Sequence, residues 1–128
     1  MLNIAVLVSG GGTNLQAILD SQARGEIPHG RVSLVVASKP GVYALERAEK
    51  AGVPGVVVRR KDYESSEAFD AALLNVLKEN HIDLVVLAGF LSILGPSVIA
   101  AYPERILNVH PSLIPSFCDE GFYGLRVH

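Results

Sequence analysis

The sequence has little of what defines several classes of protein. It contains one cysteine, Cys118, in 128 residues, so it cannot build a disulfide framework, and a reducing cytoplasm suits it. No apolar run approaches the roughly 18 residues that a membrane-spanning helix needs. The N-terminus also lacks the cationic start and the small-residue cleavage site of a signal peptide. We therefore expect a cytoplasmic protein with no membrane partner.

Charge of one sign and metal-binding clusters are also scarce. The net charge is −2 and the isoelectric point about 6.0, so the chain lacks a broad basic surface and we expect no nucleic-acid partner. The four histidines are scattered and form no zinc-type spacing with cysteine, so we expect no metal. Hydrophobic residues make up 49% of the sequence, which favours one well-buried core in a single domain over residues 1–128.

Short apolar runs alternate along the chain with helical patterns. The apolar runs are typical of strands buried on both faces, and they cover residues 3–8, 32–37, 55–58, 83–88 and 106–109. Helical patterns follow the first four runs. The third helix is the longest, and Ser65 or Ser66 is expected to cap it. Such alternation predicts an α/β fold: a doubly wound, mostly parallel, Rossmann-like sheet with helices on both faces and right-handed crossovers.

We expect the strands, numbered along the chain, to lie in the order 3-2-1-4-5. Strands 2 and 3 are then added on one side of strand 1, and strands 4 and 5 on the other, so the order reverses between strands 1 and 4. In sheets of this kind ligands bind beyond the carboxyl ends of the strands, near that reversal. The loops after strands 1, 4 and 5 would then share one crevice. Each of them carries a chemical feature: a glycine turn at residues 9–14, the loop 89–94, and the pair Asn108 and His110.

The glycine turn is the first of these features. Gly10-Gly11-Gly12-Thr13-Asn14 leads into a helix, whose free N–H groups and positive dipole end favour an anion. A dinucleotide is a poor fit, because Leu15 replaces the third glycine of the G-x-G-x-x-G motif and no acidic residue ends the second strand. The Gly-Lys-Ser/Thr ending of a P-loop is also absent. A small phosphate monoester fits better, and a plain tight turn remains the alternative.

Asn108 and His110 are the second feature. They are two residues apart on a strand, so both side chains point to the same face, and Pro111 then ends the strand. An amide donor beside an imidazole suits acyl transfer, because the amide binds the oxygen that becomes negative while the imidazole moves a proton. Alternatively, Asn108 begins a turn and His110 is a partly buried histidine with satisfied hydrogen bonds.

Three segments together resemble the phosphoribosylglycinamide formyltransferase family, folate-dependent enzymes of purine biosynthesis. They are Val-Ser-Gly-Gly-Gly-Thr-Asn-Leu-Gln at 8–16, Ala-Gly-Phe-Leu-Ser-Ile-Leu-Gly-Pro at 88–96 and Asn-Val-His-Pro-Ser-Leu-Ile-Pro at 108–115. The last motif alone is shared by other enzymes with the formyltransferase fold. The glycine turn is what favours the glycinamide ribonucleotide enzyme.

The resemblance implies a role for each matching residue. Gly12, Thr13 and Asn14 would hold the phosphate of phosphoribosylglycinamide. Asn108 would bind the formyl oxygen and His110 would donate or shuttle the proton. The cosubstrate 10-formyltetrahydrofolate would contact Asn108 and the main chain of the loop at Leu91, Ser92, Ile93 and Leu94. The implied reaction is attack of the glycinamide amine on the formyl carbon.

The sequence also departs from the pattern of that family. Some members carry basic residues where this chain has Ser66 and Ser92, which affects contacts to the folate tail. Members also continue past His128 into a strand and a loop whose aspartate orients the catalytic histidine, so the resemblance implies a C-terminally truncated chain. From that we expect a weakly active or inactive monomer or weak homodimer. A formyl-folate hydrolase and a non-catalytic phosphate-binding module are the alternative functions.

Overall fold

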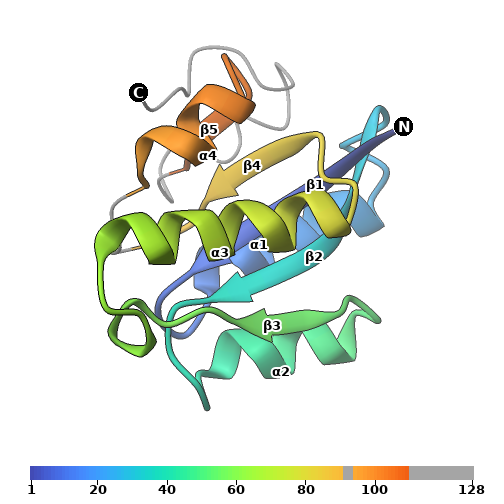
Figure 1. Ribbon diagram of the computed structural model, residues 1–128. Helices are drawn as coiled ribbons and strands as arrows, with labels where there is room; N and C mark the ends of the chain where they lie inside the picture. Colours follow the sequence, from blue (N-terminus) through green and yellow to red (C-terminus); the bar gives the residue numbers. More distant parts are fainter. Residues whose placement is uncertain (91–93, 110–128) are drawn as a thin grey trace.

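One parallel sheet forms the centre of the molecule. The computed structural model describes residues 1–90 and 94–109. In these ranges five parallel strands lie in the order β3-β2-β1-β4-β5 (Figure 1), which confirms the predicted topology. The strands are β1 (Leu2–Val8), β2 (Gly30–Ala37), β3 (Gly55–Val57), β4 (Leu84–Leu87) and β5 (Ile106–Asn108).

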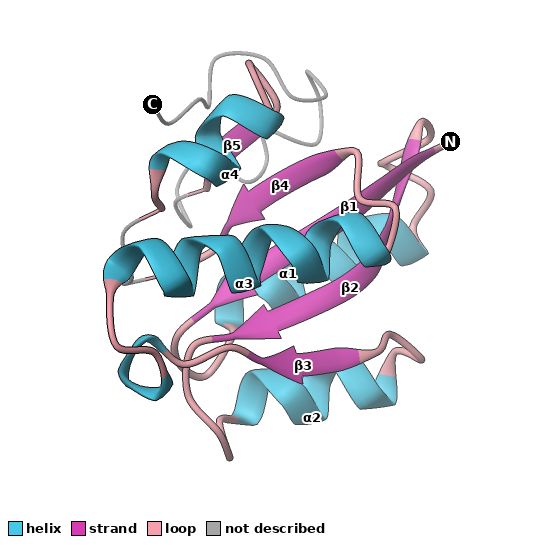
Figure 2. Cartoon of the chain, viewed as in Figure 1, coloured by secondary structure: helices cyan, strands magenta, loops and turns pink. Residues whose placement is uncertain are grey.

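Helices cover both faces of this sheet, as the alternating pattern predicts. Figure 2 shows α3 passing in front of the strands and α1 behind them. The helices are α1 (Thr13–Ala23), α2 (Tyr43–Lys50), α3 (Ser66–Glu79) and α4 (Pro96–Ala101), with a short 3-10 turn η1 (Arg60–Asp62) before α3. No helix in the described part of the chain is both long enough and apolar enough to cross a membrane.

The core has two halves because successive strand residues point to opposite faces of the sheet. In β1, Ile4, Val6 and Val8 pack toward α1 and α2. Ala5 and Leu7 pack on the other side, toward α3 and α4. All of these side chains are buried, so β1 has apolar residues on both faces and reads as a continuous apolar run.

The third helix begins where a serine caps it. Ser65 is the cap, since its Oγ accepts a hydrogen bond from the backbone N–H of Ala68 at 3.0 Å. The helix then buries an apolar stripe of Phe69, Leu73 and Leu77 against the sheet. Spacings of four residues keep these three side chains on one face of the helix.

The strand order creates a reversal beside β1. From β1 the chain steps to β2 and β3 on one side, and β4 and β5 then fill the other side. In register, Leu7 of β1 pairs with Leu87 of β4, which pairs with Asn108 of β5. The carboxyl ends of β1, β4 and β5 therefore meet at one edge of the sheet, where ligands bind in folds of this kind.

Candidate active site

The glycine turn connects β1 directly to α1. Gly12 is the residue before the helix and adopts a left-handed conformation, with φ +83°. A Cβ atom on Gly12 would lie 2.7 Å from the Cβ of Ala44 in α2. Glycine is therefore required at this position by the backbone conformation and by the close approach of α2.

Gly10 and Gly11 have no such requirement from the fold. Neither has a positive φ angle, and a Cβ atom on either would meet nothing within 4 Å. Both are exposed. Side chains at these positions would instead extend into the open space around the turn, so the two glycines keep that space clear beside the N-terminus of α1.

A side chain links the start of α1 to the end of β5. The side-chain amide of Asn14 donates to the backbone carbonyl oxygen of Val109 at 3.4 Å, across 95 residues of sequence. Val109 is buried, and its N–H donates to the carbonyl oxygen of Leu87 at 3.0 Å. The glycine turn and the Asn108 region therefore lie beside each other at the same edge of the sheet.

Asn108 is the last residue of β5 and is partly buried. It lies two strands from Leu7 at the same level of the sheet, which corresponds to about 10 Å between Cα atoms at the usual strand spacing. Leu107 packs with the α1 side of the core and Ile106 with the α3 side. By alternation Asn108 shares the face of Ile106.

The loop after β4 has two partly buried apolar residues in the described ranges, Phe90 and Leu94. Both pack against the α3 side of the core, on the face of Ile106. This loop meets α4 at Gly95. The other sequence-predicted residues of this region, Leu91, Ser92 and Ile93, and the predicted proton donor His110 lie outside the described residues.

Two residues near this edge were missed by sequence reasoning. Asp70 of α3 is 3% exposed and accepts hydrogen bonds from the backbone N–H groups of Gly95, Ser97 and Val98 at 3.1, 2.8 and 3.4 Å. Arg47 of α2 donates to the Gly11 carbonyl at 2.8 Å. Asp70 precedes Leu73 and Leu77 by three and seven residues, so the helical period places it on the apolar face of α3, and a charged residue there is a signal that sequence reasoning could have used. Arg47 gives no such signal in the sequence.

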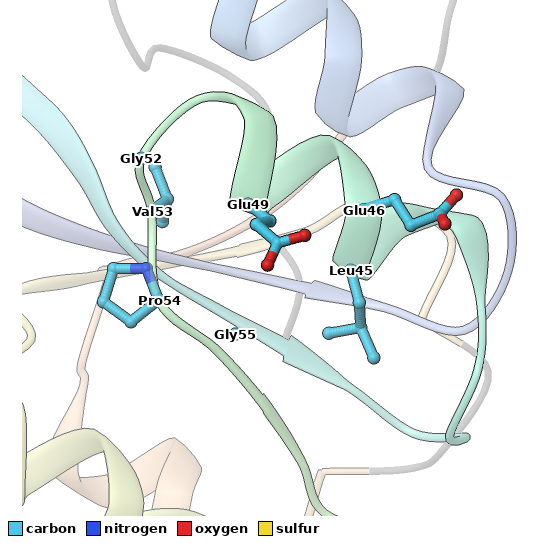
Figure 3. A pocket seen from close by; sticks show the side chains of 7 residues that line it. All are labelled: Leu45, Glu46, Glu49, Gly52, Val53, Pro54 and Gly55. Atoms are coloured by element: carbon cyan, nitrogen blue, oxygen red, sulfur yellow. The ribbon is translucent and has the colours of Figure 1, made fainter.

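A pocket lies elsewhere, at the β3 margin of the sheet, which is the opposite margin from β5. Figure 3 shows it between α2 and the start of β3. Its lining includes the carboxylates of Glu46 and Glu49, and their negative charges disfavour a phosphate. This pocket is therefore a poor candidate for the anion site expected from the glycine turn.

The parallel α/β fold, with its reversal beside β1 and its glycine turn, defines a Rossmann-like ligand-binding domain. Residues 2–128 match the family described as "Formyl transferase". The chain belongs to this formyl transferase family.

Several named proteins are similar to this chain over most of its length. Phosphoribosylglycinamide formyltransferase of Escherichia coli (strain K12) is 41% identical over 127 residues, which cover 99% of this chain and 57% of that protein. The trifunctional purine biosynthetic protein adenosine-3 of Drosophila melanogaster is 44% identical over 117 residues, covering 89% and 8%. Glycinamide ribonucleotide transformylase 1 from Symbiobacterium toebii has a TM-score of 0.82 at 49% identity and covers 91% and 55%. The chain thus spans a little over half the length of its single-function relatives.

Proposed function

We propose that this protein takes part in transfer of a formyl group from 10-formyltetrahydrofolate to the amine of phosphoribosylglycinamide, a step of purine biosynthesis. The observation that carries the proposal is the hydrogen bond from Asn14 to Val109. It joins an anion-type turn to the strand end that carries Asn108. The identities to phosphoribosylglycinamide formyltransferases support the choice of substrate.

The phosphate of the ribonucleotide is assigned to the glycine turn. Gly12, Thr13 and Asn14 lie where β1 gives way to α1, and the first N–H groups of a helix have no partner within the helix. Their partial positive charge stabilises a dianionic phosphate. The open surroundings of Gly10 and Gly11 leave room for it.

The folate is assigned to the α3 side of the sheet, at the same edge as the glycine turn. Phe90 and Leu94 are partly buried apolar residues on the side of the core that contains Ile106, and Asn108 shares that face by alternation. Apolar side chains on the same face as an amide donor fit a flat heteroaromatic ring with a polar formyl group. When bound, 10-formyltetrahydrofolate supplies the electrophilic formyl carbon. We propose that Leu91, Ser92, Ile93 and Leu94 contact it through the main chain.

Asn108 would act on the reacting atoms. Its side-chain N–H groups would donate to the formyl oxygen, which gains negative charge as the amine attacks. His110 would move the proton that the amine loses to the folate nitrogen, which leaves with its bond to the formyl carbon broken as the tetrahedral intermediate collapses. Leu7, at the end of β1, and Asn108 lie about 10 Å apart across two strands at the usual strand spacing. A single small ribonucleotide can bridge this distance.

Replacing Asn108 tests this assignment. Asn108→Ala should lower the rate of formyl transfer by about 10²–10³, as loss of one oxyanion donor typically does, with little effect on the affinity for phosphoribosylglycinamide. Steady-state kinetics with both substrates gives the rate, and calorimetry with the ribonucleotide gives the affinity. Wild-type turnover in the variant would remove Asn108 from the mechanism.

The same measurements separate the two other readings of the site. A formyl-folate hydrolase needs no phosphorylated acceptor, so it would release formate at the same rate with and without phosphoribosylglycinamide. A phosphate-binding module would bind the ribonucleotide but not the folate. Either result would contradict the proposed transfer.

A further inference from the structure

Arg47 of α2 is a partly buried cation that no step above uses, and it lies directly against the glycine turn. Its Nε–H donates to the carbonyl oxygen of Gly11 at 2.8 Å, and its Nη1 donates to Oε1 of Gln16 at 3.1 Å. The guanidinium carbon also lies 4.7 Å from the ring centroid of Tyr43. These three contacts, one of them a cation–π contact, hold the planar group in one orientation.

The bond to Gly11 sets the direction of the next N–H group. The carbonyl of Gly11 and the N–H of Gly12 belong to one planar trans peptide unit, so they point in opposite directions. Arg47 holds this carbonyl toward α2, and the N–H of Gly12 therefore points away from α2. The same bond occupies a carbonyl oxygen whose partial negative charge would repel a nearby anion.

The contact with Gln16 fixes the turn from its other end. Gln16 is in the first turn of α1, and its backbone N–H donates to the carbonyl oxygen of Gly12 at 2.8 Å. Arg47 thus bonds to Gly11, which precedes Gly12, and to Gln16, which follows it in the first turn of α1. Its own Cδ lies 3.4 Å from the place where a Cβ on Gly12 would be, so the side chain also packs beside Gly12.

We infer that Arg47 is a positioning residue for phosphate binding. It holds the glycine turn so that the N–H groups of Gly12 and of the first residues of α1 converge on one anion. The inference rests on the proposed function, because the phosphate concerned is that of phosphoribosylglycinamide. A lysine at this position keeps the charge but lacks two separate donors in a fixed plane.

Calorimetry with phosphoribosylglycinamide and the full chain tests the role of Arg47. Arg47→Gln should weaken binding about tenfold or more, the usual consequence of losing hydrogen bonds to a charged group. Arg47→Lys should behave more like Arg47→Gln than like the wild type. Because the effect acts through geometry, the ratio of affinities between wild type and Arg47→Gln should be the same at low and high salt. A through-space charge effect would instead be screened by salt.

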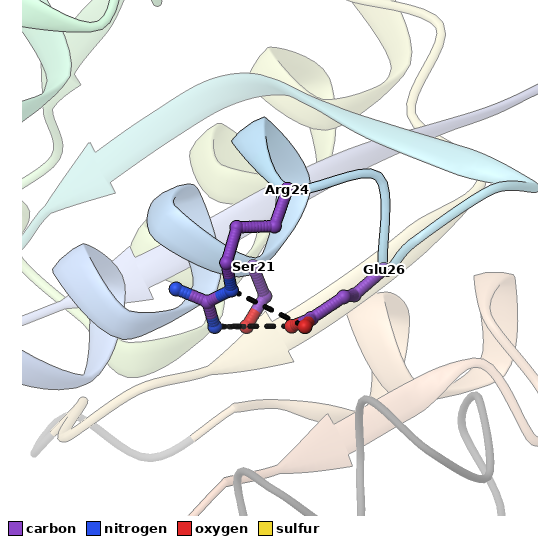
Figure 4. Close-up of polar contacts among 3 residues, drawn as sticks. All are labelled: Ser21, Arg24 and Glu26. Carbon is purple, nitrogen blue, oxygen red and sulfur yellow. Dashed lines mark hydrogen bonds and ion pairs between the residues drawn. The ribbon is translucent and has the colours of Figure 1, made fainter.

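Arg24 provides a control with the same change in charge. It lies just after the C-terminal end of α1, about 16 Å along the helix axis from Thr13 at the usual rise per residue, and bonds to Glu26 at 3.0 Å and to Ser21 at 3.3 Å (Figure 4). Its side chain is 59% exposed. Arg24→Gln should leave the affinity for phosphoribosylglycinamide unchanged, and thermal melting of each variant checks that it is folded.

The outcomes distinguish the inference from the function on which it rests. If the wild-type chain binds no phosphoribosylglycinamide, the proposed function fails and the inference fails with it. If the wild type binds and Arg47→Gln binds equally well, only the inference fails. It fails also if Arg47→Lys restores full affinity or if the loss disappears at high salt. Should Arg47→Gln not fold, Arg47→Lys decides the matter by the same criteria.

Discussion

Three consecutive glycines occupy the turn after β1, and their surroundings give them different roles. Gly12 has a positive φ angle and touches α2, whereas Gly10 and Gly11 have open space where a side chain would begin. One glycine therefore serves the fold. The other two are not required by the fold, and the proposed phosphate would need the space that they leave.

This difference can be measured with two alanine substitutions. Gly11→Ala should change the free energy of unfolding by less than about 0.5 kcal/mol but weaken the binding of phosphoribosylglycinamide. Gly12→Ala should lower the free energy of unfolding by at least about 2 kcal/mol, because it combines a strained backbone with a clash. Denaturant unfolding and calorimetry give the two quantities. Equal effects of both substitutions on unfolding would contradict these roles.

Tyr102 allows a test of pH dependence at the level of one side chain. Burial, followed by the nearby carboxylate of Asp83, raises the pKa of the Tyr102 phenol above its ordinary value of 10.0. Above that pH the unfolded chain loses the proton before the folded chain does, so stability falls as the pH rises. The stabilising contribution is fully present below pH 10.

Tyr102→Phe should remove this part of the alkaline loss of stability. The comparison is the free energy of unfolding of wild type and variant from neutral pH to above the ordinary tyrosine pKa. The free energy of unfolding of the wild type should fall relative to that of the variant as the pH rises above the ordinary tyrosine pKa. Parallel curves would mean that Tyr102 ionises equally easily in both states.

At the scale of elements, Asp70 connects α3 to α4. Its buried carboxylate accepts hydrogen bonds from three backbone N–H groups at the start of α4. Gly95 leaves the space for it, since a Cβ there would lie 2.5 Å from the carboxylate carbon. The carboxylate also complements the positive end of the α4 dipole.

Removing this carboxylate should be costly. Asp70→Ala should lower the free energy of unfolding by about 3 kcal/mol, because buried N–H groups would lose an ionised acceptor. Asp20→Ala is the matched control, since Asp20 is exposed and its carboxylate accepts from the Gln16 side chain at 2.9 Å. Its effect should stay within about 0.5 kcal/mol. Similar losses for both variants in urea unfolding would contradict the role of Asp70.

The elements themselves were largely predictable from sequence, because each produces a local pattern. The apolar runs of β1, β2 and β4 and the stripe of α3 follow from periods that the sequence shows directly. The partners of side chains that act between elements leave no such pattern, even where a charged residue on an apolar helix face, such as Asp70, indicates that a partner exists. Asp70 and Arg47 bond to backbone groups 25 and 36 residues away, and only the assembled fold brings these partners together.

At the scale of the molecule, the position of the site follows from topology. The strand order β3-β2-β1-β4-β5 was predicted from the alternation of strands and helices, and it brings the ends of β1, β4 and β5 to one edge. The contact of Asn14 with Val109 was not predictable, because the two residues are 95 apart in the sequence and only the assembled fold brings them together. The roles of Gly12, Thr13, Asn14, Asn108 and His110 remain predictions.

The central claim is that the phosphate site at the glycine turn and the formyl site at Asn108 lie in one crevice, so that bound phosphoribosylglycinamide reaches from the turn to Asn108. Titrating phosphoribosylglycinamide into the isotope-labelled chain and following each amide by NMR tests this most directly. We expect the backbone amides of Gly12, Thr13 and Asn14 and the side-chain amide of Asn108 to shift with a single affinity. Shifts confined to the pocket between α2 and β3, or shifts at the turn with Asn108 unchanged at saturation, would contradict it.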